Sequence, residues 1–322
     1  MTLRPRLLAA LGALGLVVLL WRIDLNEVRR SLLHVGWGMT LVLGQEVVAH
    51  VLNAWGWRFA FTREHAGRVS FGELIRLRVA GDAINYLTPT ATIGGEVART
   101  SLLSDACGAE DRAVSVIIAK MSQTLAQACF ITTGLLLVAT EWLAVGRWLL
   151  PWAGVGLLAA IVVAHGLRAR GAGMAAAWRR SVGAGLVGFF RDHPGRVALS
   201  TLMFGLAYAW GAFEAYWICR FLLAPVAPVT ALAIEVLSIT VDGLLFMVPA
   251  KIGTHEGGKV FAFAALGLPA SLGFAFGIVR HVRELIWAAV GVLLYWAAIS
   301  RRAPATLGHV LGDAATPSTP EA

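Results

Sequence analysis

Residues 82–99 read DAINYLTPTATIGGEVAR, and residues 242–259 read DGLLFMVPAKIGTHEGGK. Each copy begins with an aspartate, has a proline seven residues later, and ends with a basic residue three positions after a glutamate. The second copy starts 160 residues after the first, and both interrupt apolar stretches. Paired Pro/Gly interruptions in corresponding halves of a hydrophobic chain are typical of the midplane site of a transporter. The pattern therefore predicts two broken helices related by an internal repeat.

The residues of the two copies fall into two groups of candidates. The first group is charged and would contact a substrate: Glu96, Arg99, Lys120, Glu256, Lys259 and Arg280, of which Lys120 and Arg280 are again 160 positions apart. The second group would shape the site: Asp82, Pro89, Gly94, Gly95, Asp242, Pro249 and Gly253. Proline removes a backbone donor and breaks a helix, and glycine permits a sharp turn.

The chemistry of these breaks favours a polar ligand. A helix that restarts near Gly95 or Thr254 directs its free N–H groups toward the break, and such a helix start attracts anions. Each glutamate can cap the new helix and pair with the basic residue three positions later, Arg99 or Lys259. The same residues also fit a purely structural role, as helix caps and mutually neutralising ion pairs. Matched repetition of the whole pattern favours function.

The composition predicts an all-α polytopic membrane protein. Hydrophobic residues make up 58% of the 322 positions and charged residues 14%, against roughly 25% charged in soluble domains. The net charge of +8 does not indicate nucleic acid here, because the basic residues cluster in loops, where they set orientation and meet anionic lipids. The three cysteines are widely spaced and predict neither disulfides nor a metal site.

The apolar runs predict about seven or eight transmembrane helices in a single membrane domain at 1–302, with a disordered tail at 303–322. The repeat halves are roughly 1–140 and 197–302. Two interrupted segments are expected at 79–104 and 249–267, and a basic loop at 166–196 contains a surface helix at 172–190. The uninterrupted spans are expected at 7–21, 36–61, 113–139, 147–165, 197–222, 229–248 and 271–299, and 7–21 is interpreted as a retained helix rather than a cleaved signal peptide.

Basic residues at Arg4 and Arg6, in predicted loops at 63–78 and 166–196, and at Arg301 and Arg302 are all expected on the cytoplasmic side, so both termini are predicted to be cytoplasmic. The 166–196 loop can lie on the cytoplasmic side only if the segment 79–104 enters and leaves the membrane on the same side. That segment is therefore expected to be a re-entrant pair of half-helices. For the second segment, either a short crossing lies between Pro249 and Pro269 or one span is miscounted. Parallel and inverted repeats both remain open.

Several other polar residues in apolar segments are weaker candidates. Glu46, His50 and Asn53 share a helical face that either lines a path or forms a seam between helices. Arg280 and Glu284 are spaced to pair on one helix. His255 is expected to form a local hydrogen bond, although it precedes Glu256.

The two motifs resemble those of a known family. Residues 85–99, with Gly94-Gly95-Glu96-Val97-x-Arg99, and residues 248–258, with Glu256-Gly257-Gly258, resemble the flippase-like membrane domain of lysylphosphatidylglycerol synthases. With Arg280-His281-Val282-Arg283-Glu284-Leu285, they are most similar to the stand-alone, hopanoid-biosynthesis-associated branch. The resemblance implies movement of lipid between leaflets, or a supporting role in lipid traffic. Because the chain ends at Ala322 without an acyltransferase-like domain, aminoacyl transfer is not expected.

The leading hypothesis is a multi-pass inner-membrane lipid transporter, not an enzyme, that handles an amphipathic lipid with a polar or anionic headgroup. The sequence contains no Walker motif and no cofactor is expected, so transport would be driven by a gradient or run downhill. Two alternatives remain: an integral-membrane enzyme that acts on a lipid-linked substrate, and a non-transporting scaffold for lipid (hopanoid) biosynthesis.

Overall fold

The protein is helical throughout the part that the structure describes. The computed structural model describes residues 25–88, 93–104, 107–141, 176–244, 251 and 253–302. Three of its helices are long and apolar enough to cross a bilayer: Ala109–Leu137, Pro194–Phe221 and Ala270–Ser300. The expected all-helical membrane class is thus confirmed. The predictions for 7–21, 147–165, 303–322, Pro89 and Pro249 lie outside the described residues.

The described helices include two short consecutive pairs, each followed by a long helix. In chain order the helices are α2 (Leu25–Val35), α3 (Gly38–Phe59), α4 (Arg63–Arg68), α5 (Phe71–Leu87), α6 (Gly94–Leu102), α7 (Ala109–Glu141), α9 (Ala176–Asp192), α10 (Pro194–Phe221), α11 (Pro228–Leu244), α12 (Thr254–Ala265) and α13 (Ala270–Arg302). Helix α5 packs against α6, and α11 packs against α12. Each motif copy therefore bridges a helical hairpin.

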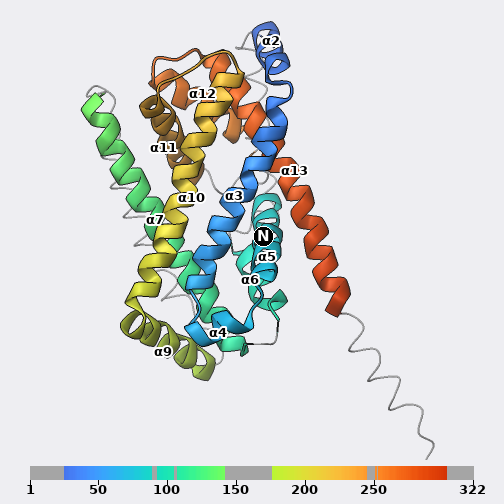
Figure 1. Ribbon diagram of the computed structural model, residues 1–322, viewed down its shortest axis with the longest axis vertical. Coiled ribbons are helices and arrows are strands. Elements are labelled where there is room, and N and C mark those ends of the chain that lie inside the picture. The colour runs from blue at the N-terminus through green and yellow to red at the C-terminus, as the bar shows by residue number, and fades with distance from the viewer. Residues whose placement is uncertain are drawn as a thin grey trace, which may run out of the picture.

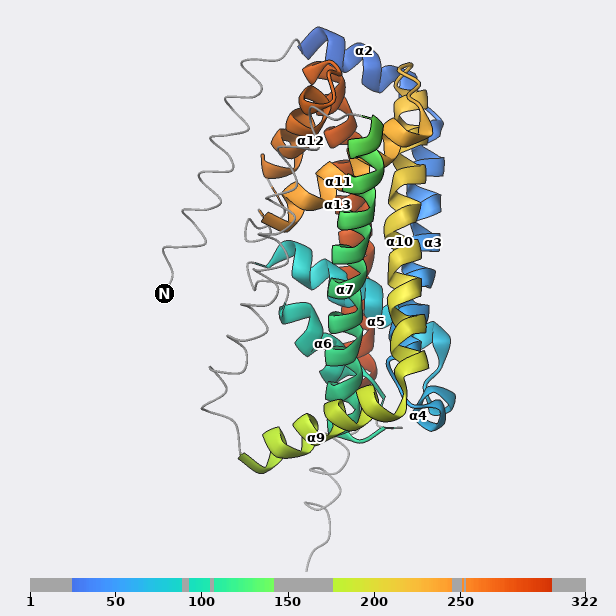
Figure 2. The ribbon, with the colours of Figure 1, turned by 90° about the vertical axis from the view of Figure 1, so that its left-hand side faces the viewer.

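The long helices form an antiparallel bundle (Figures 1 and 2). Helix α3 descends from α2 to α4, and α10 rises beside it from α9. Helix α7 likewise rises, whereas α13 descends. The α5–α6 hairpin lies in the lower half of the bundle and the α11–α12 hairpin in the upper half. Helix α12 stays in the upper half, so the predicted segment 249–267 does not cross the bundle. The long helix α13 runs down the bundle instead.

The first hairpin begins earlier than the sequence predicted. Helix α5 starts at Phe71 instead of residue 79, because the Ser70 side chain caps it by accepting a hydrogen bond from the Glu73 amide at 3.2 Å. Serine at such a position satisfies one of the free N–H groups of a helix start. Arg76 and Arg78 therefore belong to the hairpin helix, and Arg78 becomes available to the site described below.

Two apolar cores occupy opposite ends of the bundle. The upper core contains Ile218, Ile234, Phe263 and Phe276, and the lower core contains Trp57, Leu74, Ile118 and Phe204, all fully buried. Helix α3 contributes Val42 to the upper core and Ala54 to the lower core. Glu46 and His50 lie on α3 between these positions. Polar side chains are thus concentrated midway along the bundle.

The lower end of the bundle is basic. Arg196, at the start of α10, donates hydrogen bonds to the carbonyl oxygens of Phe61 and, at 2.9 Å, of Arg58, and so caps the end of α3. A guanidinium is favourable there because the last carbonyls of a helix carry partial negative charge. Helix α4, helix α9 and the end of α13 at Arg302 lie toward this same end (Figures 1 and 2).

Candidate functional site

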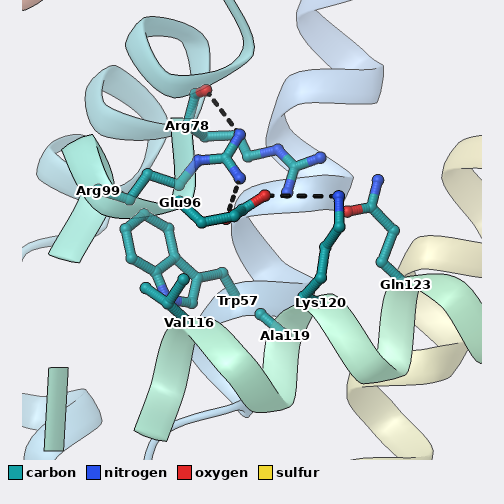
Figure 3. Close-up of a pocket in the computed structure, with 8 residues that line it drawn as sticks. All are labelled: Trp57, Arg78, Glu96, Arg99, Val116, Ala119, Lys120 and Gln123. Carbon is teal, nitrogen blue, oxygen red and sulfur yellow. Dashed lines mark hydrogen bonds and ion pairs between the residues drawn. The ribbon is translucent and has the colours of Figure 1, made fainter. Parts of the chain in front are cut away.

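The first motif copy folds into a compact cluster of charges on α5, α6 and α7 (Figure 3). We call it the lower cluster; it contains Arg78, Asp82, Glu96, Arg99 and Lys120. Arg99, only 3% exposed, donates to Asp82 at 2.6 Å and to Glu96 at 2.7 Å. Arg78 approaches the other Asp82 oxygen at 3.0 Å, and Lys120 lies 3.5 Å from Glu96. The predicted Glu96–Arg99 pair is confirmed.

Two glycines allow the helices of the lower hairpin to approach closely enough for these contacts. A Cβ on Gly81 would lie 2.5 Å from Nε of Arg99 and 3.0 Å from the Gly95 carbonyl oxygen. A Cβ on Gly95 would overlap the Gly81 carbonyl oxygen and lie 2.6 Å from the Asn85 amide group. The Gly95 amide instead donates to the Asn85 side chain at 2.7 Å. An N–H group that was expected to be free at the helix start near Gly95 is therefore already hydrogen-bonded to the Asn85 side chain.

The second motif copy forms an upper cluster that pairs differently. Lys259, fully buried, donates to both oxygens of Asp242 at 3.0 and 2.9 Å, not to Glu256 as predicted. Glu256 instead accepts the Gly253 amide at 3.1 Å and contacts His281. The reason is a close turn: Gly253 adopts a left-handed φ of 73°, which turns its N–H back onto the Glu256 carboxylate. Glu256 caps α12, as predicted.

Residues outside the motif copies complete the upper cluster. Lys251 lies 3.2 Å from Glu284 of α13 and 3.6 Å from Asp242. The Nδ1 atom of the buried His255 lies 3.9 Å from Glu284, and the local hydrogen bond expected of His255 is not found within the described residues. The upper cluster thus comprises Asp242, Lys251, His255, Glu256, Lys259, His281 and Glu284.

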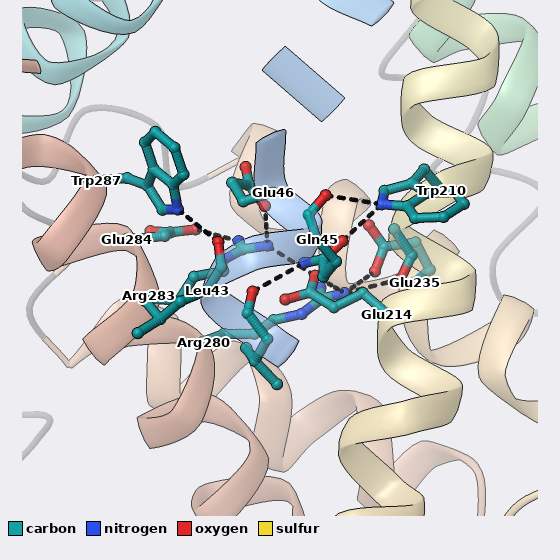
Figure 4. A network of polar contacts seen from close by, with 12 residues as sticks. Leu43, Gln45, Glu46, Trp210, Glu214, Glu235, Arg280, Arg283, Glu284 and Trp287 are labelled. Atoms are coloured by element: carbon teal, nitrogen blue, oxygen red, sulfur yellow. Dashed lines mark hydrogen bonds and ion pairs between the residues drawn. The ribbon is translucent and has the colours of Figure 1, made fainter. Parts of the chain in front are cut away.

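A third group of charges joins α3, α10, α11 and α13 (Figure 4). We call it the middle network; it contains Glu46, Glu214, Glu235, Arg280 and Arg283. Arg280 lies 3.0 Å from Glu214 and 2.6 Å from Glu235, and Arg283 lies 2.7 Å from Glu214 and 2.6 Å from Glu46. The predicted pairing of Arg280 with Glu284 is wrong, because carboxylates from α10 and α11 reach the guanidinium instead.

A cavity of about 180 Å³ lies where the three groups of charges meet. It is large enough for several water molecules. Its lining residues come from α3, α5, α13 and position 251: Glu46, His50, Val79, Asp82, Ala83, Tyr86, Lys251, Arg283, Glu284, Trp287 and Ala288. The Lys251 ammonium lies 5.9 Å from the Tyr86 ring centre, so the two hairpins meet across this cavity. Within the described residues, His50 Nε2 and the Tyr86 hydroxyl are buried without a hydrogen-bond partner.

The structure brings some predicted site residues to the cavity and places others behind it. Asp82 lines the cavity directly, whereas Arg99 and Lys259 lie behind it as partners of the two motif aspartates. Lys120 lines a separate small pocket beside Glu96 (Figure 3), and Arg280 is enclosed in the middle network. Gly94 begins α6. A role in substrate binding stays a prediction for all of these residues.

Sequence reasoning gave too little weight to several cavity residues. Glu46 and His50 share the helical face noted in the sequence, and both line the cavity, whereas Asn53 bonds back to its own helix at Ala49. Lys251 lies inside the second motif copy, so its position in the sequence could have identified it as a site residue. Glu235, which belongs to the middle network and does not line the cavity, gave no signal beyond being a charge in an apolar segment, which is itself a pointer to function.

In the described part of the chain, no three His, Cys, Asp or Glu side chains are grouped so that they could hold a metal ion.

Comparisons with known proteins give one match. The comparisons with curated proteins and with solved structures found no match. The family described as "Lysylphosphatidylglycerol synthase TM region" matches residues 6–292, most of the length of the chain. The protein is therefore a membrane protein that belongs to the lysylphosphatidylglycerol synthase transmembrane-region family.

Proposed function

We propose that the protein moves an amphipathic lipid with a polar or anionic headgroup between the leaflets of a cell membrane. The observation that carries this proposal is the cavity between the two hairpins, lined by five charged side chains, two of them basic, midway along a helical bundle. Charged residues at membrane depth are expensive and mark substrate paths. Membership of a family related to lipid handling supports the same proposal.

The geometry suits a headgroup more than a whole lipid. A cavity of about 180 Å³ accommodates a small polar group with a few waters, while the acyl chains remain in the bilayer. Lys251 and Arg283 would meet an anionic group, and the unpartnered His50 and Tyr86 would supply further hydrogen bonds. The charges of Asp82 and Glu284 are already balanced by neighbouring cations, so they would orient the head without expelling it.

We propose further that the two halves form an inverted internal repeat. Helices α6 and α12 begin 160 residues apart, at Gly94 and Thr254, as do the aspartate–cation pairs Asp82–Arg99 and Asp242–Lys259. Helices α3 and α10 run in opposite directions, as do α7 and α13 (Figures 1 and 2). Inverted repeats that place broken helices at the midplane are typical of alternating-access transporters.

The basic lower end favours an orientation. We propose that α4, α9 and the end of α13 lie at the cytoplasmic face of the inner membrane, where their basic residues bind anionic lipids. Among family members, the stand-alone, hopanoid-associated branch remains our proposed placement, on the sequence motifs quoted above.

Replacing Lys251 by methionine is expected to slow translocation about ten- to a hundredfold, because a hydrogen bond to a charged group contributes about 1.5–3 kcal/mol. The measurement is the rate at which fluorescent phosphatidylglycerol in proteoliposomes becomes accessible to dithionite. Arg220→Met is the matched control: Arg220 is exposed at the end of α10, away from the cavity, and its replacement should leave the rate unchanged.

Each alternative function predicts a different outcome of this experiment. Equal rates in vesicles with and without protein would overturn the transport proposal. Chemical conversion of the labelled lipid, detected by mass spectrometry, would show an enzyme. A scaffold would show neither movement nor conversion, and its cellular phenotype would survive Lys251→Met.

A further inference from the structure

In the upper cluster and the middle network, buried carboxylates outnumber the Lys and Arg side chains that could neutralise them. In the described residues, the upper cluster and the middle network together hold six carboxylates but four Lys and Arg side chains: Glu46, Glu214, Glu235, Asp242, Glu256 and Glu284, against Lys251, Lys259, Arg280 and Arg283. The lower cluster holds two carboxylates and three fixed cations. Uncompensated charge is costly inside a membrane protein, so the upper half requires positive charge from elsewhere.

The upper cluster by itself holds three carboxylates and two lysines, and its two histidines lie beside two of those carboxylates. His281 Nδ1 contacts the Glu256 carboxylate directly. His255 Nδ1 lies 3.9 Å from Glu284, which is beyond hydrogen-bonding distance, and neither ring nitrogen has a partner within the described residues. The two imidazole rings are 5.4 Å apart. A proton held between His281 and Glu256 thus has a second, vacant acceptor one ring away.

We propose that the pair His281–Glu256 binds a proton that is coupled to lipid movement, and that His255 passes this proton on to Glu284 at the wall of the cavity. The proton comes from water on one side of the membrane, bonds to a ring nitrogen, and is released to water on the other side, so no bond of the lipid changes. The inference rests on the proposed transport function and adds its energy source.

The groups that face the two rings explain how a proton would act on the cavity. They are Tyr86 of α5, Asp242 of α11, Lys251 before α12, Glu256 and Lys259 of α12, and Glu284 of α13, which Arg283 approaches at 3.8 Å. Of these, Glu284 is the partner that Lys251 and His255 share. A proton on His255 competes with Lys251 for Glu284 and frees the ammonium for an anionic headgroup.

This competition makes proton and headgroup binding mutually favourable. Coupling between two ligands is reciprocal, so a headgroup that draws Lys251 away from Glu284 favours the proton in turn. Lys251 is suited to changing partners because it lies at the turn of the hairpin, with a left-handed φ of 52° that is unusual for a lysine. In the lower cluster the partners of Glu96 are Arg99 and Lys120, whereas in the upper cluster the partner of Glu256 is His281. The proposed proton site therefore belongs to the upper cluster.

The test measures the leaflet distribution of labelled phosphatidylglycerol in proteoliposomes that carry a pH gradient of one unit. For each coupled proton, the steady-state ratio of label between leaflets should change by up to about tenfold relative to symmetric pH. Vesicles with His255→Gln/His281→Gln should move the label but lose this dependence on the gradient. His193→Gln is the matched control, because His193 lies outside the cluster at the start of α10, and it should behave as the wild type.

The outcomes separate this inference from the transport proposal. If the wild type moves the label but the steady-state ratio between leaflets is the same with and without the pH gradient, the proton inference is overturned while transport stands. If the wild type moves no label at either pH, the transport proposal falls, and the coupling proposal with it. Should the double variant not fold, His255→Gln alone leaves the Glu256–His281 pair intact and must still lose the gradient dependence.

Discussion

Replacing Asp242 by asparagine is expected to lower the free energy of unfolding by about 3–5 kcal/mol, the usual cost of leaving a buried charge without its partner. The substitution keeps the shape of the side chain and removes its charge. Lys259 is fully buried and donates to both Asp242 oxygens, and Glu256 is engaged with His281 and cannot replace them. The measurement is unfolding of the purified protein in a fixed detergent, followed by tryptophan fluorescence.

The corresponding change in the lower hairpin serves as the comparison. Asp82→Asn should cost less, because Arg99 keeps Glu96 at 2.7 Å and the carbonyl oxygen of Arg78 at 3.2 Å. The double variant Asp242→Asn/Lys259→Met should recover most of the loss, since it removes both charges of the pair together. Equal stability of Asp242→Asn and the wild type would contradict the buried pair described here.

The motif copies predicted the hairpins because their signals are local. Proline, glycine and a capping glutamate act within a few residues, so the starts of α6 at Gly94 and α12 at Thr254 follow from the sequence alone. The approximate positions of α3, α10 and α13 also follow from apolar length. The start of α5 was missed because Arg76 and Arg78 read as a polar loop, although both belong to the helix that Ser70 caps.

The partners of the charges were not predictable from spacing. The choice of Lys259 for Asp242 instead of Glu256, and of Arg280 for Glu214 and Glu235, depends on how α10, α11, α12 and α13 are rotated against one another. Helix rotation is set by packing of the apolar cores at both ends of the bundle, which a single sequence does not specify residue by residue. Spacing identifies only which residues share a face of one helix.

The structure also shows that the two hairpins differ in chemistry despite their common pattern. The position after the turn is Gly95 in the first hairpin and His255 in the second, 160 residues later. Glycine there permits the close contact of α5 with α6, and histidine there adds an ionisable group next to Glu284. In the proton-coupled transporter proposed above, this difference would let the hairpin that contains His255 respond to protons.

Replacing Gly95 by alanine tests the close contact between α5 and α6 in the lower hairpin. The new methyl group would overlap the Gly81 carbonyl oxygen and lie 2.6 Å from the Asn85 side chain, so α6 must move away from α5. Overpacking of this kind costs about 1–3 kcal/mol, occasionally more, and here it also weakens the bond from the Gly95 amide to Asn85. We expect a large loss of stability in the same unfolding experiment, together with slower lipid translocation, because Glu96 and Arg99 move with α6.

Gly205→Ala is the matched control, since Gly205 is also helical, on α10, and a Cβ there meets nothing within 4 Å in the described structure. Alanine is favoured over glycine in a helix by up to about 1 kcal/mol, so this variant should be as stable as the wild type or more stable. If Gly95→Ala were as harmless as Gly205→Ala, α5 and α6 would not be in contact at Gly81. The Asp82–Arg99–Glu96 arrangement, which depends on that contact, would then have to be abandoned, and with it the lower wall of the proposed headgroup path.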